Sequence, residues 1–169
     1  MAYRCYALGL IALGLTSCSS DEEFEDTVQV GGQYDMTVRN GTNACEFEDW
    51  VEGETATDIG LHIEQDRNEL DGRLEGSVGS LVVALALGTA EFTGTVAGNG
   101  VTLVAVSPYV SRDGSCTFSR EVTLRGELNG NVMSGEIEHS LATNDAPGCE
   151  GMEDCVSVQT FDAIRTSEE

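Results

Sequence analysis

The chain has 169 residues, and its 30 acidic residues face 8 arginines and no lysine, for a formal net charge of −22. A surface this acidic repels nucleic acid and anionic lipid headgroups, so nucleic-acid binding is excluded. The length that follows the amino-terminal segment suits one domain with a real core.

The amino-terminal segment is typical of an export signal. Arg4 is the sole charge before Asp21, and residues 6–15 are apolar apart from their glycines. This run is too short to span a bilayer, which takes about 20 residues, but it suits the apolar region of a secretory signal. It ends at Leu15-Thr16-Ser17-Cys18.

That tetrapeptide resembles the lipobox of bacterial lipoproteins. The resemblance implies that residues 1–17 are removed and that Cys18 carries diacylglycerol and an amino-terminal acyl chain such as palmitate. Ser19 is similar to the residue found in lipoproteins sorted to the outer membrane. The implied location is therefore the bacterial outer membrane, on its periplasmic face or at the cell surface. A signal with an incidental cysteine is the alternative.

Residues 18–31 form a polar, acidic tether, and residues 32–169 form the domain. In the domain, short runs alternate apolar and polar residues, which predicts strands, and no stretch keeps a helical period. Three hairpins are expected, with turns at Arg67-Asn68, Gly98-Asn99 and Asn129-Gly130, because Asn and Gly favour tight hairpin turns. Strands at 33–39 and 156–165 flank them.

These turns set the strand register. They place Leu61 opposite Leu74, Val96 opposite Val101, and Gly126 opposite Met133. The apolar faces of paired strands then meet, whereas a one-residue slip would set apolar against charged side chains. Continuing the third hairpin places Arg120 opposite His139.

Eight antiparallel strands in sequence order predict an all-β fold, either an up-and-down barrel or a β-sandwich. The barrel is favoured because closure removes exposed sheet edges. Gly32-Gln33-Tyr34 and Arg165 resemble the closure motif of lipocalins and related barrels, with Tyr34 where that family has tryptophan. The family's carboxy-terminal helix is missing here. The resemblance implies that Arg165 packs across Tyr34 and closes one end of the barrel.

The tight turns fall at the end where the tether enters. The long connections, 40–57, 77–89, 108–115 and 140–155, fall at the other end, which points away from the membrane. The four remaining cysteines lie on or beside these connections and predict two disulfides. Proximity in sequence favours Cys149–Cys155 with Cys45–Cys116. The pairing Cys45–Cys155 with Cys116–Cys149 stays open, because the last strand neighbours the first in a closed barrel.

Candidate ligand-binding residues lie near the open end. Arg120 and His139, both on the inward face, would hold an anionic group such as a carboxylate; the alternative is a bulge or an inner ion pair. Trp50, beside Phe47, either contacts a ligand or caps the barrel. His62 is expected on the solvated outer surface.

Inward glycines at 72, 94, 126 and 135 either leave a cavity or let the strands coil around a solid core, and the solid core is expected. The apolar segment 80–88 is expected to form a plug or an added strand, or else an exposed binding lip.

The sequence predicts no enzyme, because it contains no G-x-S-x-G, H-E-x-x-H or phosphate-binding loop. No metal or cofactor is predicted, because the chain has two histidines and no Cys-x-x-Cys pair. Two functions remain. The first is a lipid-anchored barrel that binds a small apolar or anionic ligand at its outward mouth. The second is a solid barrel that meets a protein or envelope partner through its disulfide-braced loops.

Overall fold

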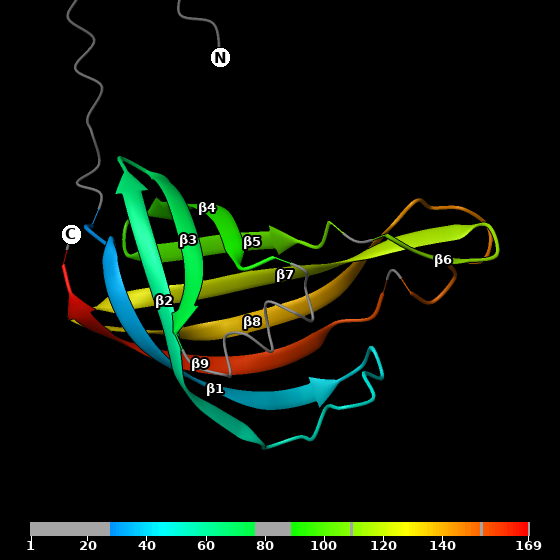
Figure 1. The fold of residues 1–169 in the computed structure, drawn as a ribbon, viewed down its shortest axis with the longest axis horizontal. Helices are drawn as coiled ribbons and strands as arrows, with labels where there is room; N and C mark the ends of the chain where they lie inside the picture. The colour runs from blue at the N-terminus through cyan, green and yellow to red at the C-terminus, as the bar shows by residue number, and fades with distance from the viewer. Residues whose placement is uncertain (1–27, 77–88, 109, 153, 169) are drawn as a thin grey trace, which may run out of the picture.

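The computed structural model describes residues 28–76, 89–108, 110–152 and 154–168 as an all-β fold. Within these ranges the chain forms strands and connections but no helix. The described residues therefore contain no helix that is long and apolar enough to cross a membrane. The strands are β1 Gly32–Asn43, β2 Thr55–Asp66, β3 Glu69–Gly76, β4 Glu91–Ala97, β5 Gly100–Val106, β6 Ser111–Asp113, β7 Cys116–Asn129, β8 Val132–Thr143 and β9 Ser157–Ser167. Figure 1 shows all of them except β6 wrapped around a common interior, with β6 on an arm that projects from the barrel.

Eight of these strands close into a ring. Neighbours in sequence pair antiparallel from β1 to β5 and from β7 to β9, β5 pairs with β7, and β9 returns to β1. This confirms the eight-stranded up-and-down antiparallel barrel, a lipocalin-like fold, over the sandwich alternative. The short strand β6 was not predicted; it pairs with the first residues of β7, outside the ring. Closure satisfies the backbone groups that a free sheet edge would expose.

The alternation of residue types in the strands becomes an inside and an outside. Along β1, the side chains of Tyr34, Met36 and Val38 are buried, while those of Asp35 and Thr37 are exposed. The same period of two runs through the other strands of the ring and gathers one apolar core. The charged faces point to solvent, as the composition requires.

The first two predicted hairpins have the predicted register. Leu61 pairs with Leu74, and Val96 pairs with Val101. In each tight turn the first central residue has a positive φ, 60° at Arg67 and 58° at Gly98. This is the position at which a type II′ turn needs it.

The predicted register of the third hairpin is wrong by two residues. Gly126 pairs with Gly135 rather than Met133, because the turn is centred on Gly130-Asn131, where Gly130 has a φ of 63°. A shift of two keeps every side chain on its predicted face. It does change partners: His139 lies opposite Val122, and Arg120 lies opposite Leu141.

The closed end of the barrel, where the tight turns lie, has the predicted closure. Arg165 pairs with Tyr34 between β9 and β1, its guanidinium carbon lies 5.5 Å from the Tyr34 ring centroid, and its Nε donates to the Tyr34 hydroxyl (3.0 Å). The hydroxyl donates in turn to the carbonyl of Val30 (2.6 Å). Burial raises the pKa of Tyr34, and the hydrogen bond from Arg165 acts against that rise. Only 7% of the Arg165 side chain is exposed.

The open end carries longer connections (Figure 1), and both disulfides lie there. The favoured cysteine pairing is wrong: the bonds are Cys45–Cys155 and Cys116–Cys149. Cys45 follows β1 and Cys155 precedes β9, which are neighbours in the ring. Cys116 starts β7 and Cys149 follows β8, which are also neighbours. Strand adjacency, rather than distance along the chain, decides the pairing.

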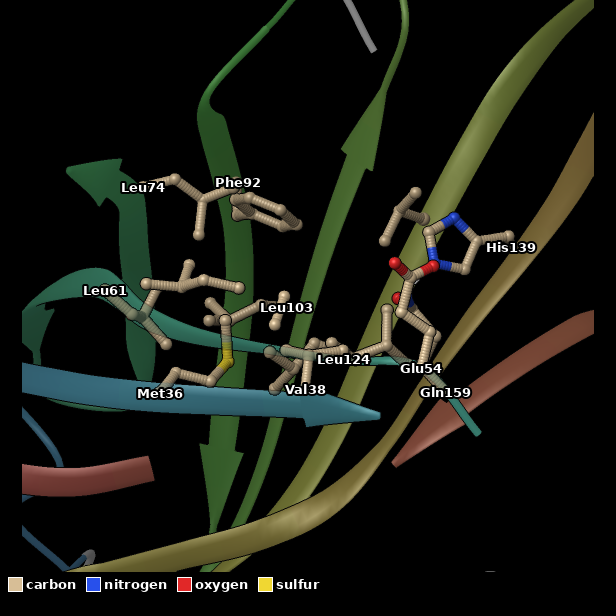
Figure 2. A pocket seen from close by; sticks show the side chains of 14 residues that line it. Met36, Val38, Glu54, Leu61, Leu74, Phe92, Leu103, Leu124, His139 and Gln159 are labelled. Atoms are coloured by element: carbon tan, nitrogen blue, oxygen red, sulfur yellow. Dashed lines mark hydrogen bonds between the residues drawn. The ribbon is translucent and has the colours of Figure 1, made fainter. Parts of the chain in front are cut away.

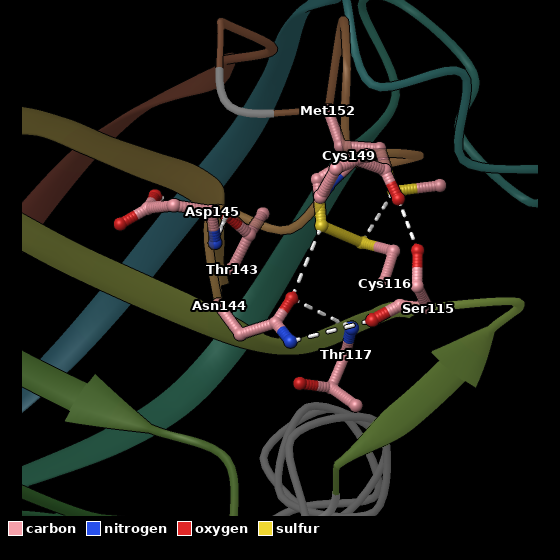
Figure 3. The surroundings of a disulfide bond; sticks show 9 residues. Ser115, Cys116, Thr117, Thr143, Asn144, Asp145, Cys149 and Met152 are labelled. Carbon is pink, nitrogen blue, oxygen red and sulfur yellow. Dashed lines mark hydrogen bonds between the residues drawn. A yellow bond between two sulfur atoms is a disulfide. The ribbon is translucent and has the colours of Figure 1, made fainter.

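The second disulfide fastens a projecting arm made of β6, the start of β7 and the residues after β8. Asn144 joins its two sides, because its Oδ1 accepts from the backbone N–H of Thr117 (3.0 Å) and its Nδ2 donates to the carbonyl of Ser115 (3.3 Å). Figure 3 shows Asn144 beside the Cys116–Cys149 bond. The arm is thus held both covalently and by hydrogen bonds.

The inward glycines allow close packing, as expected. A Cβ on Gly126 would lie 2.8 Å from the Phe161 ring, and one on Gly72 would lie 3.2 Å from Leu103. At Gly94 and Gly135 a Cβ would overlap the backbone of the neighbouring strand. These glycines therefore let strands coil and approach, and large side chains occupy the space beside them.

Several predictions concern residues outside the described ranges. These are the signal at 1–17, the acylation of Cys18, most of the tether at 18–31, and the role of segment 80–88. The domain start at residue 32 coincides with the first residue of β1. The boundaries and the acylation stay predictions.

Candidate ligand-binding site

The barrel encloses a cavity of about 310 Å³ in its open half. Most of its wall is apolar, and the polar lining residues are Glu54, His139 and Gln159. The apolar lining residues are Met36, Val38, Ala56, Ile59, Leu61, Leu74, Phe92, Leu103, Val122, Leu124 and Ile137. Glu54 and Ala56 are exposed, so the cavity reaches the surface beside them. The expectation of a solid core is therefore wrong, although the glycines act as expected.

The polar residues gather at one end of the cavity. Figure 2 shows Glu54, His139 and Gln159 together, across the cavity from Leu61, Leu74 and Phe92. His139 and Gln159 come from the neighbouring strands β8 and β9, and Glu54 directly precedes β2. An apolar space with a few polar groups at one side is the usual form of a small-molecule site.

A chain of hydrogen bonds holds the polar end in place. The Nε2 atom of His139 lies 2.7 Å from Oε1 of Gln159, whose Nε2 donates to Oδ1 of Asn40 (2.7 Å). Asn40 Nδ2 donates to the carbonyl of Val51 (3.1 Å). The chain ties β8, β9 and β1 to the connection between β1 and β2, so the His139 ring has a fixed orientation.

Two aromatic side chains of that connection cover the outer side of His139. The rings of Trp50 and Phe47 meet the His139 ring edge-on, with centroid distances of 5.4 and 6.3 Å. The Trp50 indole N–H donates to the carbonyl of Gly41 (2.9 Å), which fixes the ring. Of the two roles considered for Trp50, the geometry supports the cap, since Trp50 is half-buried and does not line the cavity.

Arg120 and His139 do converge, but not as a paired anion clamp. The guanidinium carbon of Arg120 lies 5.2 Å from the Phe47 ring centroid, a cation–π geometry, and Arg120 is exposed and does not line the cavity. The carboxyl group at the polar end belongs to Glu54. The predicted binding of an anionic group by Arg120 and His139 is therefore not supported.

Burial lowers the pKa of His139, the positive charge of Arg120 lowers it further, and the hydrogen bond to Gln159 acts in the opposite direction. The net lowering keeps the imidazole neutral at neutral pH. A neutral imidazole donates through one ring nitrogen and accepts through the other.

Sequence reasoning missed Asn40, Glu54 and Gln159. They lie on three separate segments that meet through the pairing of β1 with β2 and β9. In the sequence they are polar residues among many, and no spacing singles them out.

His62, expected on the solvated outer surface, is half-buried there, and its Nδ1 lies 3.7 Å from Oε1 of Glu75. Among the described residues, no group of three or more His, Cys, Asp or Glu side chains is arranged to hold a metal ion.

The fold and the cavity define a class of molecule, a lipocalin-like β-barrel with an internal ligand-sized cavity. No protein-family model matches the chain, and no curated protein matches it either. Among solved structures, the chain is similar to EF1p2_mFAP2b bound to DFHBI, with 14% sequence identity and a TM-score of 0.43. That match covers 82% of this chain and 94% of the other. A superposition this loose carries no argument about function.

Proposed function

We propose that this chain is an acylated lipoprotein of the bacterial envelope whose barrel binds a small, largely apolar ligand and catalyses no reaction. The observation that carries the binding proposal is the cavity of about 310 Å³. An apolar cavity of about 150 Å³ is enough to hold benzene, so this one has room for a body of about ten to twelve non-hydrogen atoms. Its volume also reaches the lower end of typical small-molecule sites.

The lining favours an apolar ligand over an anionic one. Apolar side chains make up most of the wall, and Arg120 lies on Phe47 rather than in the cavity. A buried anion would need a cation or several donors to replace its water. The cavity offers a neutral His139 and the carboxyl group of Glu54 instead.

The proposed anchor agrees with the direction from which the chain enters the barrel. The backbone N–H of Val28 donates to the carbonyl of Gly98 (3.4 Å), which places Val28 beside the β4–β5 turn at the closed end. A lipid on Cys18, ten residues earlier in the chain, would hold that end toward the membrane. The open end would then face away from the bilayer, where a ligand arrives from the aqueous side.

The binding proposal is tested by blocking the cavity at its surface. We expect Ala56→Trp to weaken the binding of naphthalene, followed by its fluorescence, about tenfold or more, because the indole would occupy the space beside Ala56. Thr55→Trp is the matched control, since Thr55 is the adjacent, outward-facing residue of β2 and does not line the cavity. Equal binding by both variants, at an unchanged unfolding midpoint, would refute the site.

The anchor is tested by labelling cells with a palmitate analogue. Cys18→Ala should abolish the label and release the protein from the membrane fraction. Cys5→Ala is the control, because Cys5 lies in the segment that is removed, and it should keep both properties. A Cys18→Ala protein that stays in detergent-extracted membranes would contradict the proposed acylation.

A further inference from the structure

The proton on the His139 ring can be located from a backbone carbonyl. The carbonyl of Val51 can only accept, so the Asn40 atom 3.1 Å from it is the amide nitrogen. The other Asn40 atom, Oδ1, must then accept from Nε2 of Gln159 (2.7 Å). This turns Oε1 of Gln159 toward His139, and an oxygen that can only accept requires a proton on Nε2 of the ring (2.7 Å).

The second ring nitrogen of His139 is then an acceptor. Burial keeps the ring neutral, so Nδ1 carries a lone pair and no proton. Glu54 adds the oxygens of its carboxyl group, which accept when it is ionised. Among the side chains of the three polar residues that line the cavity, Gln159 alone has an N–H that can still donate to a ligand. Its amide nitrogen has two N–H groups, and one of them donates to Asn40. The polar end is therefore rich in acceptors.

The charge around the polar end of the cavity also favours a cationic head group over an anionic one. Arg120 is the basic residue whose charge acts on His139, and its guanidinium lies over the Phe47 ring, at the rim and outside the cavity lining. The chain as a whole carries a net charge of −22. A field of this sign raises the local concentration of cations and lowers that of anions.

From this geometry we propose that the cavity selects ligands whose apolar body ends in a hydrogen-bond donor, an alcohol or an ammonium group, and discriminates against carboxylates. The donor would be accepted by Nδ1 of His139 and the carboxyl group of Glu54, with the apolar body against Leu61, Phe92 and Leu103. The selection rests on the proposed function, because it presumes that the cavity binds ligands. It adds the chemical class of the ligand's head group.

Four probes that share the naphthalene ring system test the selection: naphthalene, naphthylmethanol, naphthylmethylamine and naphthoate, titrated into the full mature chain at neutral pH and followed by calorimetry. We expect the alcohol and the ammonium to bind about tenfold or more tightly than naphthoate. The affinity of naphthalene should lie between that of these two probes and that of naphthoate. Naphthalene has no head group, so its binding reports on the cavity alone.

Glu54→Gln tests the acceptor role. The amide keeps the shape, loses the charge and gains a donor, so naphthylmethylamine should bind about fivefold or more weakly, naphthoate more tightly, and naphthalene as before. Glu52→Gln is the matched control: it removes the same charge from an exposed residue of the same connection that does not line the cavity. It should leave all four affinities unchanged.

The outcomes separate the two proposals. If naphthalene binds but naphthoate binds as tightly as naphthylmethanol, the head-group selection is overturned and the binding function stands. If Glu52→Gln weakens the ammonium as much as Glu54→Gln does, the preference comes from the overall field, and the selection is again overturned. If none of the four probes binds, both proposals fall.

Discussion

The two ends of the barrel are built differently from the same eight strands. At the closed end, Tyr34, Arg165 and Val30 fill the interior, and the strands are joined by two-residue turns. At the open end the interior is a cavity, the connections are longer, and disulfides join neighbouring strands. The closed end is thus held by packing and hydrogen bonds, and the open end by disulfides and hydrogen bonds around a space. Both ends are thus stabilised, but the disulfides stabilise the open end without filling its interior, which leaves room for a site.

The largest expected effect comes from removing the disulfide that braces the cavity mouth. Cys45→Ala with Cys155→Ala opens a link across 110 residues, and the chain-entropy model gives a loss of about 4.8 kcal/mol in the free energy of unfolding. The pair Cys116 and Cys149 spans 33 residues, so its removal should cost about 3.7 kcal/mol by the same model. Urea unfolding of both double variants measures the difference.

The same variants test whether the two ends are separable. Loss of the Cys45–Cys155 bond should raise hydrogen exchange in residues 44–54 while β1 and β9 stay protected beside Tyr34 and Arg165. Simultaneous loss of protection in all strands would mean that the ends form one cooperative unit.

An intermediate effect is expected at the closed end. Arg165→Met keeps the length of the side chain but removes the donors to the Tyr34 hydroxyl and to the carbonyl of Gln29 (2.6 Å). A loss of about 2–3 kcal/mol follows from two missing hydrogen bonds made by a charged, buried group. The affinity for naphthalene should not change, since neither residue lines the cavity. Arg112→Met, at an exposed position of β6, is the control and should leave stability unchanged.

The smallest expected effect is a pH dependence that comes from the open end. The pKa of His139 is lower in the folded chain than in the unfolded chain, so the unfolded state binds more protons as the pH falls through the range between these two values. The free energy of unfolding should therefore decrease with falling pH in that range. His139→Gln should remove this part of the slope, whereas His62→Gln should keep it.

The groups that face His139 are part of this test. Arg120 lowers its pKa, and Glu54 lies at the same end of the cavity. Arg120→Gln should therefore move the pH dependence to higher pH, closer to the ordinary histidine value. An unchanged profile would show that the charge of Arg120 does not reach the ring.

The strands followed from the sequence because they depend on local patterns, and closure of the barrel was expected because it removes exposed sheet edges. Alternation of apolar and polar residues defined the strands, and Tyr34 and Arg165 marked the closed end. Turn chemistry gave two registers correctly at Arg67-Asn68 and Gly98-Asn99. It failed at the third hairpin, because Asn129-Gly130-Asn131 contains two plausible turns and the chain uses Gly130-Asn131.

The disulfide pairing and the site were decided by the tertiary structure. Cys45 meets Cys155 because β1 and β9 are neighbours only when the ring closes. Likewise Asn40, Glu54, His139 and Gln159 come together through three strand pairings, and no local pattern marks them. Whether the barrel is hollow depends on how side chains from all eight strands share one interior, a packing outcome that periodicity does not specify. Apart from Arg120, which is exposed, the inward-facing residues followed from the alternation in the sequence, whereas what they enclose depends on closure of the barrel.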